Sequence, residues 1–421
     1  MTTADAPFSL LPDDDVRRIV AERAQTLDLA GKRVLLIVPD DTRTCPIGLM
    51  IGALNDAIGP AVTSLDVLIA LGTHQPMSLE RIYRHLGIDA AYHQAKLPKT
   101  RFLNHAWNDP ARLKTVGTIP SLTLRELSAG CLDGAIDVKV NSVIFDYDHL
   151  IIVGPTFPHE VVGFSGGNKY FFPGIAGPEI IDMFHWLGAL ITNRRVIGTH
   201  YTPVRAVVDH CAAMIDLPKH CFSLVVTKAG LHGIYFGTPE QAYDQAARHS
   251  AQVHIKHMPQ PFHTVISVCP EMYPELWTAG KCMYKLEPIV AQGGTLVIHG
   301  PHLAEVSKTH GHWIEQVGYH VLPYFTSQFE KFRHVPWGVL AHSTHVKGTG
   351  RYEGGVEVPD VNVTLATALS PEACRKINLG YRDPGSINLD DYRGREAEGV
   401  LVVERAGEVL YRLESDLPVS E

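Results

Sequence analysis

Three short and predominantly apolar runs, each followed by small and polar residues, constrain the fold of this chain most strongly. The runs are VLLIV at 34–38, LDVLIAL at 65–71 and LIIV at 150–153. Such continuous runs are typical of parallel strands that are buried on both faces. Similar strand candidates lie at 223–226, 265–268 and 295–298. Helical patterns, for example at 13–30 and 78–86, alternate with the strands, so the chain is predicted to be an α/β protein with mainly parallel sheets.

A change in composition predicts where the chain divides. With 421 residues it is long enough for two domains, and the stretch HIKHMPQP at 254–261 is polar and carries two prolines before the next strand begins. We expect the active site in a cleft between two α/β domains. The expected parts are an N-terminal domain with the cofactor motifs at 1–258, a C-terminal domain at 259–385, and a tail packing on the N-terminal domain at 386–421. Within the tail, 400–403 and 408–413 are expected to form a hairpin.

The composition argues against several classes of protein. A net charge of −8 disfavours nucleic acid as the main partner, because binding phosphates requires a basic surface. The seven cysteines include no C-x-x-C pair, so they predict neither a zinc site nor a disulfide framework, and they fit a reducing compartment. The first residues lack an apolar signal core, and no apolar run approaches the roughly 20 residues that a membrane span requires. We therefore expect a cytoplasmic protein that binds neither nucleic acid nor membrane.

Two polar clusters directly follow the first two predicted strands. Asp40-Asp41-Thr42-Arg43 follows the first, and Gly72-Thr73-His74 follows the second. In open α/β sheets, ligands bind in the crevice beyond the carboxyl ends of the strands. Arg43 has the geometry to hold a carboxylate or phosphate in a bidentate fork, and the alternative is a capped turn with a surface salt bridge. A single histidine such as His74 is more often an ordinary loop residue, so the position of these clusters carries the argument.

The third run is followed by the glycine-rich segment PHEVVGFSGGNKYFFPG at 158–174. Its glycines allow backbone N–H groups to approach an anion, and Lys169 adds a positive charge and a potential nucleophile. Tyr170 follows the lysine where a phosphate loop of ATP-binding proteins has Ser or Thr, so ordinary ATP chemistry is not predicted. A glycine-rich structural turn is the alternative.

The histidines allow a metal site without requiring one. His185 lies in an apolar segment with a helical pattern, where a histidine is usually a core residue, although neutral imidazole also suits nickel, zinc and copper. A second group of histidines has a spacing that matches no compact metal site, and we interpret it as surface or pocket lining. Its members are His299, His302, His310, His312 and His320.

Taken in order, these clusters resemble the lactate racemase family, the enzymes that use a nickel-pincer nucleotide. The motifs of the resemblance are Asp40-x-Thr42-Arg43, Gly72-Thr73-His74-x-Pro76, His159, Gly163-Phe164-Ser165-Gly166-Gly167-x-Lys169, Pro173-Gly174 and His185. The resemblance extends over essentially the whole chain, but its motifs are concentrated between residues 40 and 185. The order and spacing of these separate elements make a chance match unlikely.

The resemblance implies a cofactor and a role for each motif residue. The cofactor is pyridinium-3-thioamide-5-thiocarboxylate mononucleotide with nickel, bound covalently through Lys169, and His185 is the protein ligand of the metal. The other residues implied in cofactor binding are Asp40, Thr42, Ser165, Gly166 and Gly167, with the two glycines around the phosphate. His74 and His159 are implied as the acid–base pair, and Arg43 as the residue that orients the substrate. Enzymes that build the cofactor are implied as partners.

The resemblance also implies a reaction, the inversion of C2 in a 2-hydroxy acid. The C2 hydrogen is a poor acid, because its removal as a proton would leave a carbanion beside a carboxylate. Its transfer as hydride to the cofactor and back, through a 2-keto acid, avoids that carbanion. Two bases are needed because the hydroxyl points in different directions in the two stereoisomers. Histidine suits both positions, since its unperturbed pKa is about 6.5.

The sequence departs from the lactate-specific pattern in the second half of the chain. Lys281 is present and is implied to bind the carboxylate, but Trp277 and Thr278 stand where a Tyr-Gln pair is expected. We therefore expect a more polar substrate, for example an aldonic acid such as gluconate, bonded by Thr278 and by histidines after Gly300. An aromatic acid stacked on Trp277, or lactate itself, is the alternative.

Two other classes of function remain open. The first is a nickel-free protein that binds a nucleotide or phosphate through the glycine-rich loop. The second is a non-catalytic metal-binding protein that uses the histidine-rich stretch, in which metal binding would survive the loss of His185.

Overall fold

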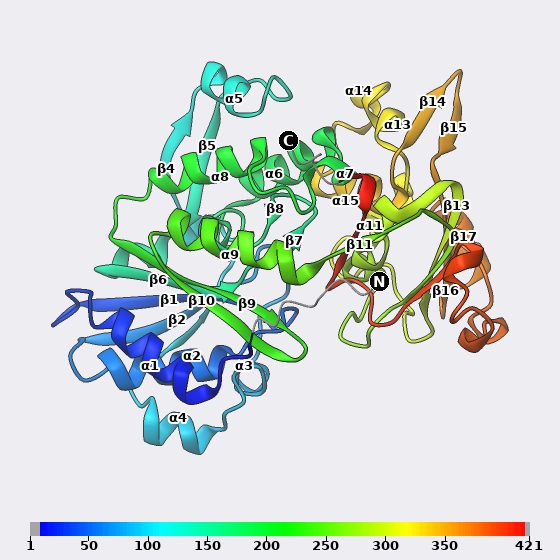
Figure 1. Ribbon diagram of the computed structural model, residues 1–421. Coiled ribbons are helices and arrows are strands. Elements are labelled where there is room, and N and C mark those ends of the chain that lie inside the picture. Colours follow the sequence, from blue (N-terminus) through cyan, green and yellow to red (C-terminus); the bar gives the residue numbers. More distant parts are fainter. Residues whose placement is uncertain (1–8, 417–421) are drawn as a thin grey trace.

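The computed structural model describes residues 9–416 and contains two mainly parallel sheets, which Figure 1 shows at the left and right of the molecule. The first sheet has six strands in the order β10-β9-β6-β1-β2-β3. These strands are β1 (Arg33–Pro39), β2 (Ser64–Ala70), β3 (Phe102–Asn104), β6 (His149–Pro155), β9 (Lys219–Thr227) and β10 (Gly230–Gly237). All neighbours in this sheet are parallel except β9 and β10.

The topology of this sheet creates a crevice beside β1. The chain first builds outward from β1 to β2 and β3, and then returns to place β6 on the other side of β1. In the register, Ile37 of β1 lies opposite Leu68 of β2 and Ile152 of β6. Such a reversal of strand order is where ligands bind in open α/β sheets, just outside the carboxyl ends of the strands. The loops that follow β1, β2 and β6 therefore meet at one edge.

Helices cover both faces of the first sheet, which explains the continuous apolar runs. The helices up to residue 254 are α1 (Asp13–Ala24), α2 (Ile47–Ile58), α3 (Leu79–Leu86), α4 (Ala90–Lys96), α5 (Ser121–Leu127), α6 (Pro178–Ile191), α7 (Asn193–Val196), α8 (Pro203–Ala213) and α9 (Pro239–His254). Val34, Leu36 and Val38 pack in one core with residues of α1 and α2. Leu35 and Ile37 point to the opposite face and pack in a core with α6 and α8. Because successive side chains of a strand alternate between faces, β1 needs apolar residues at every position.

The second sheet has five parallel strands in the order β17-β16-β13-β12-β18. They are β12 (Phe262–Val268), β13 (Val290–Gly300), β16 (Val361–Thr367), β17 (Gly380–Tyr381) and β18 (Val400–Val403). The helices of this part are α10 (Leu276–Ala279), α11 (Lys281–Tyr284), α12 (Gly311–Val317), α13 (Leu322–Thr326), α14 (Phe329–Phe332), α15 (Trp337–Lys347) and α16 (Pro371–Lys376). Between residues 9 and 416, no helix has both the length and the apolar character needed to cross a membrane.

Four two-stranded pairs complete the structure. They are β4 (Leu113–Ile119) with β5 (Ile136–Asn141), β7 (Pro158–His159) with β8 (Gly163–Phe164), β11 (Ile255–Met258) with β19 (Leu410–Leu413), and β14 (Gly350–Glu353) with β15 (Val356–Pro359). The β11–β19 pair is parallel, with Ile255 opposite Leu410 and Met258 opposite Leu413. It joins the segment just before the second sheet to the segment just after it. The chain thus passes between the two parts twice, next to this pair.

Helix α6 of the first part packs against α15 of the second part. The Asp182 carboxylate of α6 accepts a hydrogen bond of 3.0 Å from the backbone N–H of Gly338, at the start of α15. A side-chain acceptor at this position satisfies one of the free N–H groups of a helix N-terminus. Nearby, the rings of Trp186 and Phe329 stack with centroids 5.6 Å apart. These contacts hold α14 and α15 against α6.

The prediction of an α/β fold with mainly parallel sheets is confirmed, and two local predictions are wrong. The first helix ends at Ala24 rather than near residue 30. Just after this end, the Thr26 hydroxyl donates to the Arg23 carbonyl at 2.7 Å and competes with helical hydrogen bonding. The hairpin at 400–413 does not form, because β18 pairs in parallel with β12 and β19 pairs in parallel with β11. The loop around Ala406 and Gly407 leads from one sheet to another. The domain boundaries and the packing of the tail as a unit stay predictions.

Candidate active site

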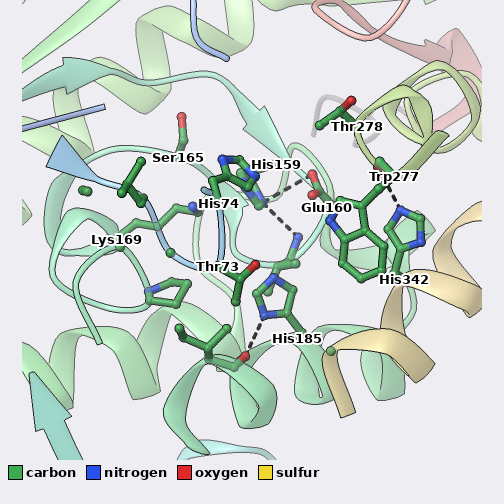
Figure 2. Close-up of a pocket in the computed structure, with 18 of the residues that line it drawn as sticks. Thr73, His74, His159, Glu160, Ser165, Lys169, His185, Trp277, Thr278 and His342 are labelled. Atoms are coloured by element: carbon green, nitrogen blue, oxygen red, sulfur yellow. Dashed lines mark hydrogen bonds and ion pairs between the residues drawn. The ribbon is translucent and has the colours of Figure 1, made fainter. Parts of the chain in front are cut away.

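One cavity brings together the residues that the sequence singles out. It lies at the carboxyl ends of β1, β2 and β6 and is closed by α6, α10, α11 and α15. Figure 2 shows Lys169 and Ser165 on one side, Trp277, Thr278 and His342 on the other, and His74, His159 and His185 between them. The predicted site residues that line the cavity are Asp40, Arg43, His74, His159, Ser165, Gly166, Lys169, His185, Trp277, Thr278 and Lys281. Thr42 and Gly167 lie just behind this lining.

Asp40 and His74 form a carboxylate–imidazole pair at the ends of β1 and β2. Asp40 Oδ2 lies 2.5 Å from His74 Nδ1, and Asp40 Oδ1 accepts a hydrogen bond of 2.6 Å from the Thr42 hydroxyl. Burial alone would raise the pKa of the Asp40 carboxyl, but the charges and hydrogen bonds of His74, Arg43 and Thr42 hold that pKa well below its usual value. An ionised carboxylate only accepts, so the shared proton belongs to His74 Nδ1. The lone pair of His74 Nε2 is then free to take a proton.

His159, at the end of β7, has a different environment. Its side chain is buried, and its Nδ1 accepts a hydrogen bond of 3.1 Å from the backbone N–H of Val161. The neutral ring therefore carries its proton on Nε2. Burial lowers the pKa of His159 well below 6.5, and the charge of Glu160 partly opposes this effect. The two histidines thus offer different groups, a lone pair on His74 and an N–H on His159.

Glu160 is a cavity residue to which sequence analysis assigned no role. Its Oε2 lies 3.4 Å from His159 Nδ1. Burial would raise the pKa of its carboxyl, but the charges of His159, Lys281 and His345 hold that pKa below its usual value. Glu160 is therefore ionised at neutral pH and compensates nearby positive charge. The sequence signal that could have identified Glu160 as a site residue is its position next to His159.

The glycine-rich loop is shaped mainly by its own surroundings. Gly166 has a φ of +90°, and a Cβ there would lie 2.1 Å from the Thr156 hydroxyl oxygen. Gly167 has a φ of +56°, and its Cβ would lie 2.8 Å from the Pro239 carbonyl oxygen. The Ser165 hydroxyl donates to the Pro155 carbonyl and accepts from the Phe157 N–H, both at 3.0 Å. These contacts explain the tight turn of the loop, and its predicted role in binding the cofactor stays a prediction.

A buried arginine holds the same loop from behind. Arg205 of α8 is 1% exposed and donates from its two terminal nitrogens, at 3.2 Å to the Gly166 carbonyl and at 2.5 Å to the Phe164 carbonyl. Its guanidinium also lies 3.8 Å from the centre of the Tyr243 ring. The loop between β8 and Lys169 is therefore fixed, and the lysine projects from a rigid support into the cavity.

Lys169 is a lysine with unusual acidity. Burial, followed by the charge of Arg43, lowers the pKa of its ammonium to about 7, although the charge of Glu160 opposes this. It forms no ion pair with any residue between 9 and 416. At neutral pH a large fraction of the amine is therefore neutral, which is the form that reacts as a nucleophile.

This acidity predicts the pH dependence of labelling. In cofactor-free protein, acylation of Lys169 should rise with pH and reach half its maximum near pH 7, because burial disfavours the ammonium form. Exposed lysines, with a pKa of about 10.4, should label much more slowly in this range. Peptide mass mapping after a short pulse of an amine-reactive reagent between pH 5 and 10 measures both curves. A Lys169 curve that follows the exposed lysines would contradict the burial of its amine.

His185 has the environment of a potential metal ligand. Its Nδ1 donates a hydrogen bond of 2.6 Å to the Ile181 carbonyl one turn earlier in α6, which leaves the Nε2 lone pair available toward the cavity (Figure 2). Burial lowers the pKa of its ring, so the ring is neutral at pH 7. Metal-bound histidines typically donate their other N–H to a carbonyl or carboxylate in this way. Among residues 9–416, no group of three or more His, Cys, Asp or Glu side chains is placed to hold a metal. A metal on His185 would thus need ligands from a bound cofactor.

Two basic side chains, Arg43 and Lys281, face the cavity near the carboxylates of Asp40 and Glu160. Within residues 9–416, the hydrogen bonds of Arg43 go to Thr42, at 3.0 Å to its hydroxyl and 3.2 Å to its carbonyl. Lys281 lies 4.7 Å from the centre of the Tyr273 ring. Burial and the charge of Arg43 lower the pKa of Lys281 well below its usual value. An anion between these two groups would remove their mutual repulsion, so they mark the site for a carboxylate.

The second part of the chain contributes a wall of aromatic and imidazole rings. The Trp277 indole is stacked on His342, with centroids 3.8 Å apart, and contacts the His310 ring at 4.4 Å. The Thr278 hydroxyl donates to the Glu275 carbonyl at 3.0 Å, which leaves its lone pairs free. Trp277 therefore already has ring partners within the protein, which disfavours the stacking of an aromatic substrate on it.

The histidine-rich stretch does not form a cluster. His302 bonds to the Tyr273 carbonyl at 3.1 Å, and His320 bonds to Glu357 at 3.0 Å. His312 contacts the ring of Trp313. Of this stretch only His310 lines the cavity, where it is joined by His342 and His345 of α15. Sequence analysis missed His342 and His345, because nothing in their local sequence distinguishes them from ordinary helical residues.

Comparison with known proteins connects this arrangement to one family. The model of the lactate racemase N-terminal domain matches residues 17–198. Lactate racemase from Thermoanaerobacterium thermosaccharolyticum is 29% identical over 169 residues, which are 40% of this chain and 35% of that protein. Lactate racemase from Lactiplantibacillus plantarum is 24% identical over a segment of the same coverage. The chain thus matches about a third of the length of these curated relatives.

Solved structures are similar over almost the whole chain. The crystal structure of a protein from Thermotoga maritima has a TM-score of 0.88 and 30% identity, and covers 96% of this chain and 99% of that one. The structure of the lactate racemase apoprotein from Thermoanaerobacterium thermosaccharolyticum has a TM-score of 0.71 and 17% identity, and covers 96% and 94%. At this identity the second likeness concerns the fold alone.

Proposed function

This chain belongs to a lactate racemase-like family, and we propose that it is a racemase or epimerase that inverts C2 of a 2-hydroxy acid. The observation that carries the proposal is the placement of His74 and His159 in one cavity with Arg43 and Lys281. Inversion at C2 requires two proton-transfer groups and a fixed carboxylate, and this cavity contains candidates for each.

The cavity also fits the nickel-pincer nucleotide of the family, and we include it in the proposal. Lys169 offers an amine that is partly neutral at pH 7 on a rigid loop, and His185 offers one free nitrogen lone pair. When bound between Lys169 and His185, this group would supply a hydride acceptor for the C2 hydrogen. Loading of the cofactor would make its maturation enzymes partners of this protein.

The remaining residues bind the substrate and move its hydroxyl proton. Arg43 and Lys281 would hold the carboxylate, and His74 Nε2 would take the hydroxyl proton of one stereoisomer. Asp40 keeps the His74 ring in the correct tautomer and stabilises its charged form, since its carboxylate lies 2.5 Å from Nδ1. For the other stereoisomer, His159 would contact the substrate hydroxyl through Nε2, because its Nδ1 already accepts from the Val161 N–H. The Glu160 carboxylate, 3.4 Å from His159 Nδ1, would compensate positive charge that develops nearby.

We further propose that the substrate is a sugar acid such as gluconate rather than lactate. Support comes from the polar wall opposite Lys169, which includes Thr278 and His310. The contacts of Trp277 with two imidazoles count against the aromatic acid, and the wall has more hydrogen-bonding groups than the methyl group of lactate can use.

A substrate panel tests this proposal. The protein, co-expressed with cofactor-building enzymes, is incubated with single stereoisomers of gluconate, lactate and phenyllactate, and the C2 epimer is quantified by chiral chromatography. We expect a C2 epimer from gluconate at the highest kcat/KM. Faster conversion of lactate or phenyllactate would contradict the sugar acid but keep the racemase. No inversion of any acid by protein shown to be loaded would contradict the enzyme proposal and favour a phosphate- or nucleotide-binding protein.

A further inference from the structure

We infer that His342 and His345 of α15 form a subsite that binds the hydroxyl groups beyond C2 of a polyhydroxylated substrate. The inference takes the orientation of the substrate from the proposed function, but the observations that support it concern the ring nitrogens of His342 and His345. Both histidines line the cavity, and three of their ring nitrogens are buried and have no hydrogen-bond partner among residues 9–416.

His345 is the stronger of the two observations. Its side chain is only 3% exposed, and neither Nδ1 nor Nε2 has a hydrogen-bond partner within the described part of the chain. Burial lowers the pKa of the ring to about 4, against the opposing charge of Glu160, so the ring is neutral at pH 7. A neutral imidazole has one N–H donor and one lone pair. An unpaired donor and an unpaired acceptor on one buried ring are rare in proteins and call for a ligand with both functions.

His342 offers one further acceptor. Its Nε2 lies 2.9 Å from the Trp277 carbonyl oxygen, which only accepts, so the ring proton is on Nε2. Burial lowers the pKa of this ring to about 3, and its Nδ1 lone pair has no donor within residues 9–416. The stacked indole of Trp277 prevents the ring from turning freely. His342 Nδ1 therefore requires a donor from the bound molecule.

The helix presents the two rings together. His342 and His345 are three residues apart on α15, and residues at this spacing lie on one face of a helix. The contact between Asp182 and Gly338 holds this face in register with α6, which carries His185. The subsite thus lies in the same cavity as His185, the residue proposed to bind the metal.

The chemistry of these atoms selects hydroxyl groups. A hydroxyl both donates and accepts, so two neighbouring hydroxyls can satisfy all three nitrogens. A second carboxylate has no donor hydrogen for His342 Nδ1 and would lie close to the ionised Glu160. An apolar tail would leave every nitrogen desolvated and unpaired, which is unfavourable. A metal is disfavoured, since no group of three ligands exists among residues 9–416.

The decisive experiment compares two acids of equal chain length. Gluconate carries hydroxyls at C3 to C6, and 2-hydroxyhexanoate carries none there. We expect loaded wild-type protein to prefer gluconate by at least about 100-fold in kcat/KM, because a site with unpaired polar groups rejects the analogue that lacks the partner. His345→Phe, which keeps a ring but removes both nitrogens, should reduce this preference about 10- to 100-fold and leave 2-hydroxyhexanoate within about threefold.

Two further variants exclude a general effect on folding. His345→Gln restores a donor and an acceptor and should recover part of the preference. Val346→Ala removes a buried apolar side chain from the same helix and should leave the preference unchanged. Thermal unfolding of all variants confirms that they are folded. An unchanged gluconate preference in folded His345→Phe would overturn the subsite.

A binding measurement separates the subsite from the proposed reaction. Isothermal titration of the same variants without cofactor, using gluconate and 2-hydroxyhexanoate, reports recognition without turnover. Tighter binding of gluconate that is lost in His345→Phe, with no inversion of either acid, would support the subsite and contradict the racemase. Inversion of both acids at equal rates, with equal affinities, would keep the racemase and overturn the subsite.

Discussion

Replacement of Lys169 by alanine should abolish both cofactor attachment and turnover. Lys169 lies in the loop after β8, lines the cavity and has a pKa near 7. Among residues 9–416, no other amine lies in this loop, so none can substitute for it there. We expect kcat/KM to fall by roughly 10⁴-fold or more, as it does when a covalent catalytic residue is removed. Intact mass spectrometry should show a nucleotide-sized, nickel-containing adduct on wild-type protein and none on Lys169→Ala.

The control for this variant is Lys139→Ala, which removes a half-buried lysine outside the cavity that pairs with Glu179 at 2.8 Å. It should carry the adduct and keep wild-type activity. The adduct on both variants would show that attachment occurs elsewhere. An adduct on neither, with maturation shown to work on another enzyme of the family, would favour the nickel-free alternative.

The Asp40→Asn variant should have the second largest effect. An amide at this position can donate to His74 Nδ1, which would move the ring proton to Nε2 and remove the lone pair that accepts the hydroxyl proton. Replacement of the carboxylate that orients a catalytic histidine reduces kcat by about 10⁴-fold in a well-studied case, and we expect a loss on the order of 10³–10⁴-fold. Kinetics with a substrate that wild-type protein inverts measure the loss, and the adduct mass should be unchanged.

Asp41→Asn is the matched control, because it changes the neighbouring carboxylate in the same loop. Asp41 points away from the His74 ring and pairs with Arg81 through two bonds of 2.6 Å. Loss of this ion pair should reduce the stability of the fold slightly, and kcat/KM should change only a few-fold. Equal losses in both variants would mean that the loop conformation, rather than the tautomer of His74, limits activity.

The sequence predicts those parts of the site in which the functional residues directly follow a predicted strand in the same short segment. The apolar run of β1 requires a strand buried on both faces, so Asp40 and Arg43 fall at its carboxyl end without further information. The order of strands in the sheet then brings the loop with His159 beside them. Residue type and spacing were sufficient here, because the loop lengths leave few alternatives.

Other parts of the site depend on contacts between distant segments, which no local pattern reveals. His345 has the surroundings of a normal helical residue in sequence, and only the packing of α15 on α6 places its ring in the cavity. Thr42 was expected to bind the cofactor; its hydroxyl bonds to Asp40 and Arg43, and its role toward the cofactor stays a prediction. The glycines at 166 and 167 are required by their φ angles and by the chain behind them, and their role in phosphate binding also stays a prediction.

The parallel pair of β11 and β19 restricts how the cavity can open. Both crossings of the chain between the two parts are adjacent to this pair, one after Met258 and one before Leu410. Since the two strands are hydrogen-bonded along their length, they cannot slide past each other without breaking the ladder. The two parts are therefore held together at two separate places, at this strand pair and at the contact between Asp182 and Gly338.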